Sequence, residues 1–247
     1  MKLDGLTALV TGSTGSLGSA MTLALADAGC NCVCHYHTNR ARADNLADQI
    51  RAKGRKALAI QADLTQPHEI SELVTQAHTL GPLRILINAA AVFAREPLGC
   101  VTFDTARRTL DTNLIAPILT ARDFTRAIAE ETKDTPVPAA KIVNIVDVAG
   151  LRPWAEYAIY SASKAGLIAA TKSLARELLP AVTVNAVAPG LVTWPEGFSE
   201  QEKARQLKYV PMKRTARPDE ITDAVLFLLK NDYMTGHVLT VDGGRSI

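Results

Sequence analysis

Tyr160 and Lys164 lie four residues apart in Tyr160-Ser161-Ala162-Ser163-Lys164, near the start of a predicted helix. This spacing places the two side chains on one face of the helix. A phenol whose pKa is near 10 is a poor acid–base group at neutral pH, and a neighbouring ammonium favours the phenolate and lowers that pKa. We therefore expect a tuned hydroxyl that can donate a proton while a hydride reaches a substrate.

A glycine-rich turn, Thr11-Gly12-Ser13-Thr14-Gly15-Ser16-Leu17-Gly18, follows the first predicted strand and opens the first predicted helix. Glycines permit a tight turn and let the backbone approach a pyrophosphate, and the amides at the helix N-terminus point at the anion. The same turn could be an ordinary strand–helix connection. Its place between the first strand and the first helix of a parallel sheet favours dinucleotide binding.

The end of the second predicted strand reads Tyr36-His37-Thr38-Asn39-Arg40, and no acidic residue follows before Asp44. An acid at this position would bind the ribose 2′-hydroxyl of NAD. Here a 2′-phosphate would meet no carboxylate, and Arg40 could pair with it as a planar fork. Arg40 could also be only the solvated first turn of the next helix. The sequence favours NADP over NAD.

Short β-rich runs alternate with amphipathic helical stretches, which predicts one α/β Rossmann-like domain over residues 1–247. The expected strands are 6–10, 31–36, 56–61, 84–88, 141–146, 182–188 and 238–241, and the expected helices are 17–28, 40–53, 67–80, 103–132, 157–179 and 218–229. Together they predict a doubly wound parallel sheet with helices on both faces. Pro117 is expected to bend the long helix. The segment 191–215 interrupts the alternation and predicts a lid over the site.

Composition narrows the class of protein. The 247 residues could bury about 70% of their unfolded surface, and the 47% of hydrophobic residues exclude disorder as the main state. The net charge of +2 is too small to indicate a nucleic acid or an anionic membrane as partner. No apolar run is long enough to span a bilayer and no secretory signal is recognised, so we expect a cytoplasmic protein with free cysteines.

Three cysteines, Cys30, Cys32 and Cys34, alternate along the second predicted strand and would share one of its faces. They could form a metal or redox cluster. Buried small side chains are the better interpretation, because free cysteine is among the most buried residue types and no zinc-type spacing accompanies the three. No metal site is expected.

These motifs, in this order, resemble the short-chain dehydrogenase/reductase superfamily in its compact single-domain form, over essentially the whole chain. The resemblance rests on Thr11-Gly12-x-x-x-Ser16-Leu17-Gly18, Ala62-Asp63-Leu64, Asn88-Ala89-Ala90-Ala91, Asn113, Tyr160-x-x-x-Lys164 and Pro189-Gly190-Leu191-Val192-Thr193. It implies that Asp63 contacts the adenine, that Lys164 also holds the nicotinamide ribose and that Asn113 supports a water relay to Lys164. The cofactor-binding set it implies is Gly12, Ser13, Ser16, Leu17, Gly18, His37, Thr38, Asn39, Arg40, Asp63, Asn88, Ala89, Tyr160, Lys164, Pro189, Gly190 and Thr193.

One position departs from the family pattern. A serine usually stands thirteen residues before the tyrosine, and this chain has Asp147 there. An ionised carboxylate cannot donate a hydrogen bond to a substrate carbonyl, and it would repel the oxyanion that develops when a ketone is reduced. It suits a substrate that carries its own N–H groups or needs a second proton.

Within the superfamily, this aspartate resembles the pteridine reductase branch, as do His35-Tyr36-His37 and Gln61-Ala62-Asp63-Leu64. Phe93 lies where that branch stacks an aromatic ring on the pterin, although it could also be a loop anchor. Ser16 and Ala91 depart from the branch, which commonly has an arginine and a serine at these two positions.

The sequence thus predicts an NADPH-dependent reductase acting on a pterin, a dihydropterin or a dihydrofolate-like C=N bond. Asp147, Tyr160, Lys164 and Asn113 would form the catalytic set, and Phe93, Asp147, Tyr160 and Trp194 would bind the substrate. The alternatives are a carbonyl reductase of ketoacyl thioesters or other ketones, and an NADP-binding sensor or scaffold without turnover. The resemblance also implies a homotetramer.

Overall fold

A seven-stranded parallel sheet runs through the middle of the molecule, in the order β3-β2-β1-β4-β5-β6-β7. The computed structural model describes residues 1–194 and 197–247. The strands are β1 (Thr7–Thr11), β2 (Asn31–Tyr36), β3 (Ala57–Gln61), β4 (Leu83–Asn88), β5 (Ala140–Ile145), β6 (Val182–Pro189) and β7 (Val238–Val241). Strand order reverses between β1 and β4, and in open α/β sheets ligands bind in the crevice at such a switch point. The predicted doubly wound sheet is confirmed.

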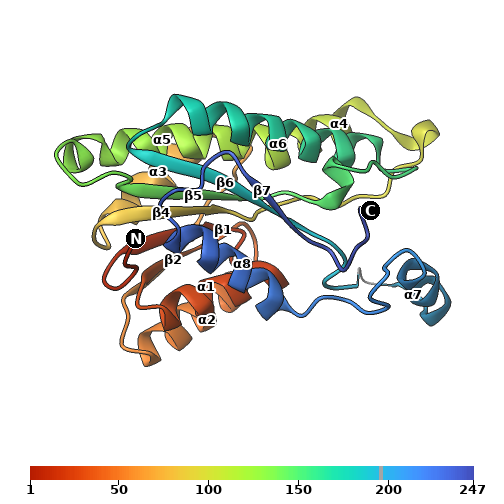
Figure 1. Cartoon of the computed structure of the whole chain (residues 1–247), viewed down its shortest axis with the longest axis horizontal. Coiled ribbons are helices and arrows are strands. Elements are labelled where there is room, and N and C mark those ends of the chain that lie inside the picture. The colour runs from red at the N-terminus through yellow and green to blue at the C-terminus, as the bar shows by residue number, and fades with distance from the viewer. Residues whose placement is uncertain (195–196) are drawn as a thin grey trace.

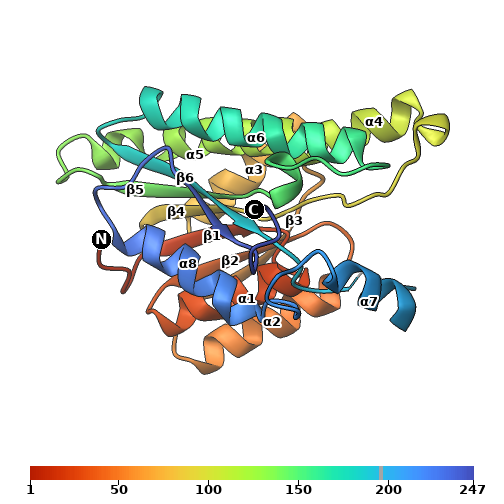
Figure 2. The same cartoon turned by 45° about the vertical axis from the view of Figure 1, so that its right-hand side comes forward.

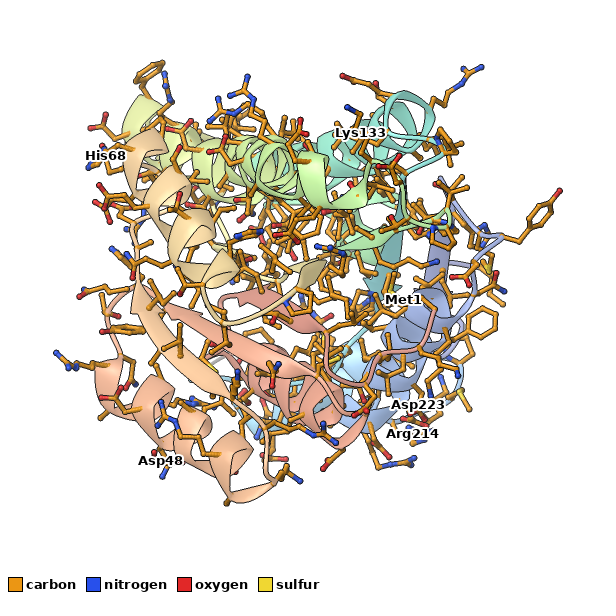
Figure 3. The ribbon with its side chains drawn as sticks, turned by 90° about the vertical axis from the view of Figure 1, so that its left-hand side faces the viewer. Met1, Asp48, His68, Lys133, Arg214 and Asp223 are labelled. Carbon is orange, nitrogen blue, oxygen red and sulfur yellow. The ribbon has the colours of Figure 1, made fainter. Side chains whose placement is uncertain are left out.

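Helices cover both faces of the sheet (Figure 1). One layer holds α1 (Ser16–Asp27), α2 (Arg40–Ala52) and α8 (Pro218–Lys230), and the other holds α3 (Pro67–His78), α4 (Phe103–Leu110), α5 (Ala116–Thr132) and α6 (Ala158–Glu177). The same two layers are clear in the turned view of Figure 2. Figure 3 shows His68 and Lys133 on the side of the α3 layer and Asp48 on the side of the α2 layer.

Strands buried on both faces explain the continuous apolar runs of the sequence. In β1, Val10 packs into the core that lies under α1 and α8, whereas its neighbour Leu9 packs into the core under α3 and α5. Neither side chain is accessible to solvent. The predicted and observed element boundaries differ by only one or two residues at most ends, which is the usual fraying of helix and strand termini.

The long helix predicted over 103–132 is interrupted by a turn of π-helix, η2 (Asp111–Ile115), between α4 and α5. The amide of Ala116 donates to the carbonyl of Asp111, a bond that spans five residues instead of four. Pro117, the next residue, has no amide hydrogen to donate. The regular α-helical hydrogen bonding is therefore interrupted at both Ala116 and Pro117. The distortion lies just before the predicted bend and includes Asn113.

Cys30, Cys32 and Cys34 are fully buried in the core under α1. Burial raises the pKa of the Cys30 and Cys34 thiols to about 12, which keeps them protonated and unreactive. They are free thiols. The prediction that they are core residues is confirmed.

The segment 191–215 leaves the sheet and holds a helix that was not predicted, α7 (Glu200–Leu207). Ser199 caps this helix, and the amide of Ala216 bonds the carbonyl of Leu191, 2.8 Å away, at the base of the segment. Pro195 and Glu196, which the lid prediction includes, lie outside the described residues. In Figure 1, α7 stands at the same end of the sheet as the C-terminus. Among the described residues, no helix is both long and apolar enough to cross a membrane.

Candidate active site

The glycine-rich turn between β1 and α1 lies tightly against the end of β4. Gly12 has φ +66°, and a Cβ atom there would come within 2.7 Å of the Cα of Ala90. A Cβ at Gly18 would strike the carbonyl of Gly12. Glycine is therefore required at both positions by geometry, and the exposed backbone forms a cradle that a phosphate group fits.

His35, at the end of β2, holds this turn in place. The amide of Gly12 donates to His35 Nδ1 at 2.9 Å, and Nε2 donates to the carbonyl of Ala62 at 3.0 Å. The amide and hydroxyl of Ser13 both donate to the carbonyl of His35. Burial lowers the pKa of His35 to about 4, so the imidazole is neutral. This role of His35 was not predicted from the sequence, where the available signal was a polar residue inside a buried strand.

The candidates at the β2 end are exposed and serve local structure. Asn39 caps α2 by accepting a hydrogen bond from the amide of Arg42, and Arg40 pairs with Asp44 at 3.4 Å. His37 Nε2 lies 4.0 Å from Asp63 Oδ2, so these two candidates are neighbours. His37, Thr38, Asn39, Arg40 and Asp63 do not line the cavity described next.

A cavity of about 1130 Å³ opens at the carboxyl ends of the strands. It brings together residues that are far apart in the sequence and that the sequence analysis selected: Gly12, Ser16, Leu17, Gly18, Ala89, Phe93, Asp147, Tyr160, Lys164, Pro189, Gly190, Thr193 and Trp194. Ser13 and Asn88 are buried behind it. The Asn88 amide donates to Asn144 Oδ1 at 2.9 Å and so joins the ends of β4 and β5.

Asp147 and Tyr160 are joined directly. Asp147 caps the short helix η3 (Val148–Gly150) with Oδ1, which accepts from the Ala149 amide at 2.7 Å. Its other oxygen, Oδ2, accepts from the Tyr160 hydroxyl at 2.8 Å. Lys164 Nζ donates to the carbonyl of Ile145 at 3.0 Å and lies 5.9 Å from the centre of the Tyr160 ring.

These contacts reverse one expectation about charge. Burial and the adjacent Asp147 raise the pKa of Tyr160 well above its usual value, so the expectation that Lys164 lowers it was wrong. Burial is the main cause, and the phenol also bonds the Asp147 carboxyl group and not the ammonium. Burial also raises the pKa of Asp147 and lowers that of Lys164 to about 8. The Tyr160 hydroxyl therefore keeps its proton at neutral pH and donates it in the hydrogen bond to Asp147.

Asn113 lies in the π-helical turn and is fully buried. Its side-chain oxygen accepts from the Val92 amide at 2.7 Å, and its Nδ2 donates to the Val92 carbonyl at 2.9 Å and to Ser163 Oγ at 3.2 Å. Asn113 therefore ties the loop that carries Phe93 to helix α6, which carries Tyr160. In this structure it makes no hydrogen bond to Lys164.

Aromatic rings form one wall of the cavity. Phe93 stacks on Tyr157 with ring centres 5.2 Å apart and meets the edge of Tyr160 at 4.9 Å. Trp154 packs edge-on against Tyr157. Tyr157 and Trp154 were not predicted from the sequence, because the loop before α6 carries no motif of its own. Arg245, whose guanidinium lies 4.8 Å from the Trp154 ring centre, was not predicted either.

The glycine cradle at the switch point and the Tyr160–Lys164 pair in one cavity define a dinucleotide-dependent oxidoreductase of the doubly wound α/β class. Residues 12–246 match the family model described as Enoyl-(Acyl carrier protein) reductase. The chain belongs to the short-chain dehydrogenase/reductase superfamily, whose members bind NAD(P).

Three comparisons are informative. A 3-oxoacyl-(acyl-carrier-protein) reductase of Synechocystis sp. is 32% identical, over 96% of this chain and 95% of that protein. The crystal structure of a blue fluorescent protein from a metagenomic library, in complex with NADPH, is 32% identical with a TM-score of 0.88 over 100% of both chains. FolM Alternative dihydrofolate reductase 1 from Brucella canis, complexed with NADP, is 28% identical with a TM-score of 0.91, over 99% of this chain and 95% of that chain.

Proposed function

We propose that the protein is an NADPH-dependent reductase of a pterin, a dihydropterin or a dihydrofolate-like C=N bond. The observation that carries this proposal is the Asp147 carboxylate, bonded to the Tyr160 hydroxyl in the cavity. A ketone-reducing site needs a neutral donor where this chain has an acceptor. The similar structure of FolM Alternative dihydrofolate reductase 1, complexed with NADP, supports this proposal.

The residues fit the cofactor. The turn from Gly12 to Gly18 would hold the pyrophosphate, because its backbone is open and backed by the N-terminus of α1. His37 and Arg40, exposed at the β2 end, would meet the 2′-phosphate, while Lys164 and Thr193 would hold the nicotinamide end. When bound, NADPH supplies the hydride that is added to the carbon of the C=N bond.

The side chains of the cavity have separate roles in this proposal. Tyr160 supplies the proton that the nitrogen of the C=N bond gains, directly or through water. Asp147 accepts hydrogen bonds from the amino or ring N–H groups of the substrate, and the Tyr160 oxygen regains its proton from solvent. Phe93 offers a flat apolar face, because about half of its surface is exposed to the cavity mouth and solvent.

A carbonyl reductase is the second candidate, and the Synechocystis relative named 3-oxoacyl-(acyl-carrier-protein) reductase favours it. It would use the same Tyr160 and Lys164. Against it stands the acceptor at position 147, which takes the hydrogen bond of the Tyr160 hydroxyl where the family pattern has a serine donor. A sensor or scaffold without turnover is disfavoured, since Tyr160, Lys164 and Asn113 are all present.

NADPH oxidation with dihydrobiopterin and dihydrofolate, beside acetoacetyl thioester and simple ketones, tests the proposal. We expect turnover of the pterins, and a loss of about 100-fold or more in Asp147→Ser, as for removal of a preorganised group in an active site. Asp223→Ser, an exposed change on α8, is the matched control and should behave as wild type. Ketone turnover that survives or rises in Asp147→Ser, without pterin turnover, would establish the carbonyl reductase.

We further propose a cytoplasmic homotetramer with a single domain and a lid at 191–215. Exposed apolar side chains support association of subunits. They are Leu98 and Phe103, before and in α4, and Phe227 and Tyr233, in and after α8. Light scattering of the purified protein would give the mass directly. A monomer at micromolar concentration would contradict the tetramer.

A further inference from the structure

The turn after β7 carries a guanidinium into the cavity. Gly243 and Gly244 have φ +63° and +85°, and a Cβ atom on Gly244 would lie 3.0 Å from Pro211. The Asp242 carboxylate accepts a hydrogen bond from the Gly244 amide at 2.9 Å and another from the Ser246 amide at 2.7 Å. Asp242 thus closes the turn on both sides of Arg245, and the two glycines lie against the segment that follows α7.

The Arg245 side chain is held on two sides and has one nitrogen to spare. Its guanidinium lies over the Trp154 ring at 4.8 Å, and Nη2 donates to Gln206 Oε1 of α7 at 2.8 Å. Nη1 is buried, and among the described residues it has no hydrogen-bond partner. A buried donor without an acceptor is costly, by roughly 1–3 kcal/mol. This nitrogen is therefore suited to an acceptor that arrives with a ligand.

Arg245 and Asp147 line the same cavity. Their opposite charges attract, so Arg245 lowers the pKa of Asp147 and Asp147 raises the pKa of Arg245, each against the effect of burial. One offers N–H donors and the other offers acceptor oxygens. A donor and an acceptor that face one cavity are complementary to a lactam edge, –NH–C(=O)–, which presents the opposite pair of groups.

We propose that Arg245 is a specificity-determining residue that donates a hydrogen bond from Nη1 to the carbonyl oxygen of a lactam in the substrate, while the lactam N–H faces Asp147. The inference rests on the proposed function and adds which edge of the heterocycle is read. The Trp154 ring, over which the guanidinium lies, fixes the orientation of this planar group. Gln206 links this contact to α7, so the recognition also involves the segment 191–215.

The test compares two ligands on Arg245→Met, Arg245→Gln and the surface control Arg126→Gln. Dihydrobiopterin carries the lactam, and a diaminopteridine inhibitor has an amino group in place of its carbonyl. In Arg245→Met we expect KM for dihydrobiopterin to rise about tenfold to a hundredfold, as for a lost hydrogen bond from a charged group. We expect kcat to change little and the Ki of the diaminopteridine to stay the same or fall. Arg245→Gln keeps an N–H donor and should give an intermediate KM.

Several outcomes decide the matter. An unchanged KM in Arg245→Met, in a protein that reduces dihydrobiopterin, would overturn the role of Arg245 and leave the proposed function standing. An equal loss for both ligands would also overturn it, because a merely structural role affects both alike; the melting temperature of each variant shows whether the fold is intact. A wild-type protein that does not reduce dihydrobiopterin would overturn the proposed function and the lactam contact together.

Discussion

Single side chains determine which chemistry the cavity can perform. Burial and the hydrogen bond to Asp147 raise the pKa of Tyr160, so its hydroxyl keeps the proton at neutral pH. The buried Lys164 ammonium is the group whose charge is sensitive to mild alkali, since burial lowers its pKa to about 8 while Asp147 opposes the shift. The pair therefore works as a protonated donor next to a titratable cation.

Lys164 gives a prediction for cofactor binding. Below its pKa the amine is a charged hydrogen-bond donor to the nicotinamide ribose, and this charge is lost as pH rises through about 8. We expect the Kd for NADPH, measured by fluorescence titration, to rise by about tenfold as the pH is raised through the pKa of Lys164. A tenfold change in Kd is equivalent to one pKa unit of interaction.

Lys164→Met should bind more weakly at neutral pH and should lose this step. Lys172→Met, an exposed change on the same helix, is the control that keeps it. A step of the same size in Lys164→Met would assign the titration to another group.

At the scale of helices and strands, two buried side chains in or next to connecting turns position the site. The π-helical turn η2 aims Asn113 at the loop after β4 and at α6 together, and the His35 side chain fastens the glycine-rich turn to the end of β3. Both contacts are made by buried polar groups whose partners are all supplied by the backbone or by a neighbouring element. The cradle and the catalytic helix are thereby fixed relative to the sheet.

The buried His35 predicts a loss of stability in acid. Its pKa is about 4 in the folded chain against 6.5 when unfolded, so between these values only the unfolded chain binds the proton. The free energy of unfolding must then fall as pH falls through this window, by up to about 1.4 kcal/mol per pH unit.

Urea unfolding at several pH values measures this slope. His35→Asn should reduce it, whereas His68→Asn, which changes an exposed histidine on α3 (Figure 3), should not. Equal slopes in wild type and His35→Asn would show that other groups cause the acid sensitivity.

Across the whole molecule, the two ends of the sheet have different tasks. The cavity lies at the carboxyl ends of the strands, and the amino end of β5 holds a buried cation instead. Lys141 is 1% exposed, and its Nζ bonds Asp232 at 2.8 Å and the carbonyl of Asn231 at 2.8 Å. The amino group of Met1 joins the same carboxylate at 2.7 Å, so the start of the chain is fastened beside the end of α8 (Figure 3).

We expect Asp232→Asn to destabilise the fold by about 1–3 kcal/mol, because a buried ammonium loses its counter-charge but Asp232 itself is half exposed and partly screened. Chemical unfolding measures the change. Lys141→Met should restore most of the loss when it is added to Asp232→Asn, since it removes the unpaired charge. Turnover should be unaffected in both. A double variant as unstable as Asp232→Asn would disprove the pairing.

The amino-acid sequence by itself determined the parallel sheet, its helices and the glycine-rich turn. These features depend on hydrophobic period, glycine placement and the order of elements, all of which are local or nearly local. The burial of Cys30, Cys32 and Cys34 followed from the same kind of pattern. The sequence also singled out Asp147, Tyr160 and Lys164, which the fold brings to one cavity.

Tertiary structure alone decided how those groups are charged and what surrounds them. The partner of the Tyr160 hydroxyl depends on where the Asp147 side chain lies after β5. The pKa of each group depends on its burial, which the spacing of residues along the sequence cannot give. Arg245, Trp154 and Tyr157 reach the cavity from a C-terminal turn and a loop that carry no motif pointing there. Their convergence on one site is a property of packing between distant segments, and only the folded chain contains that information.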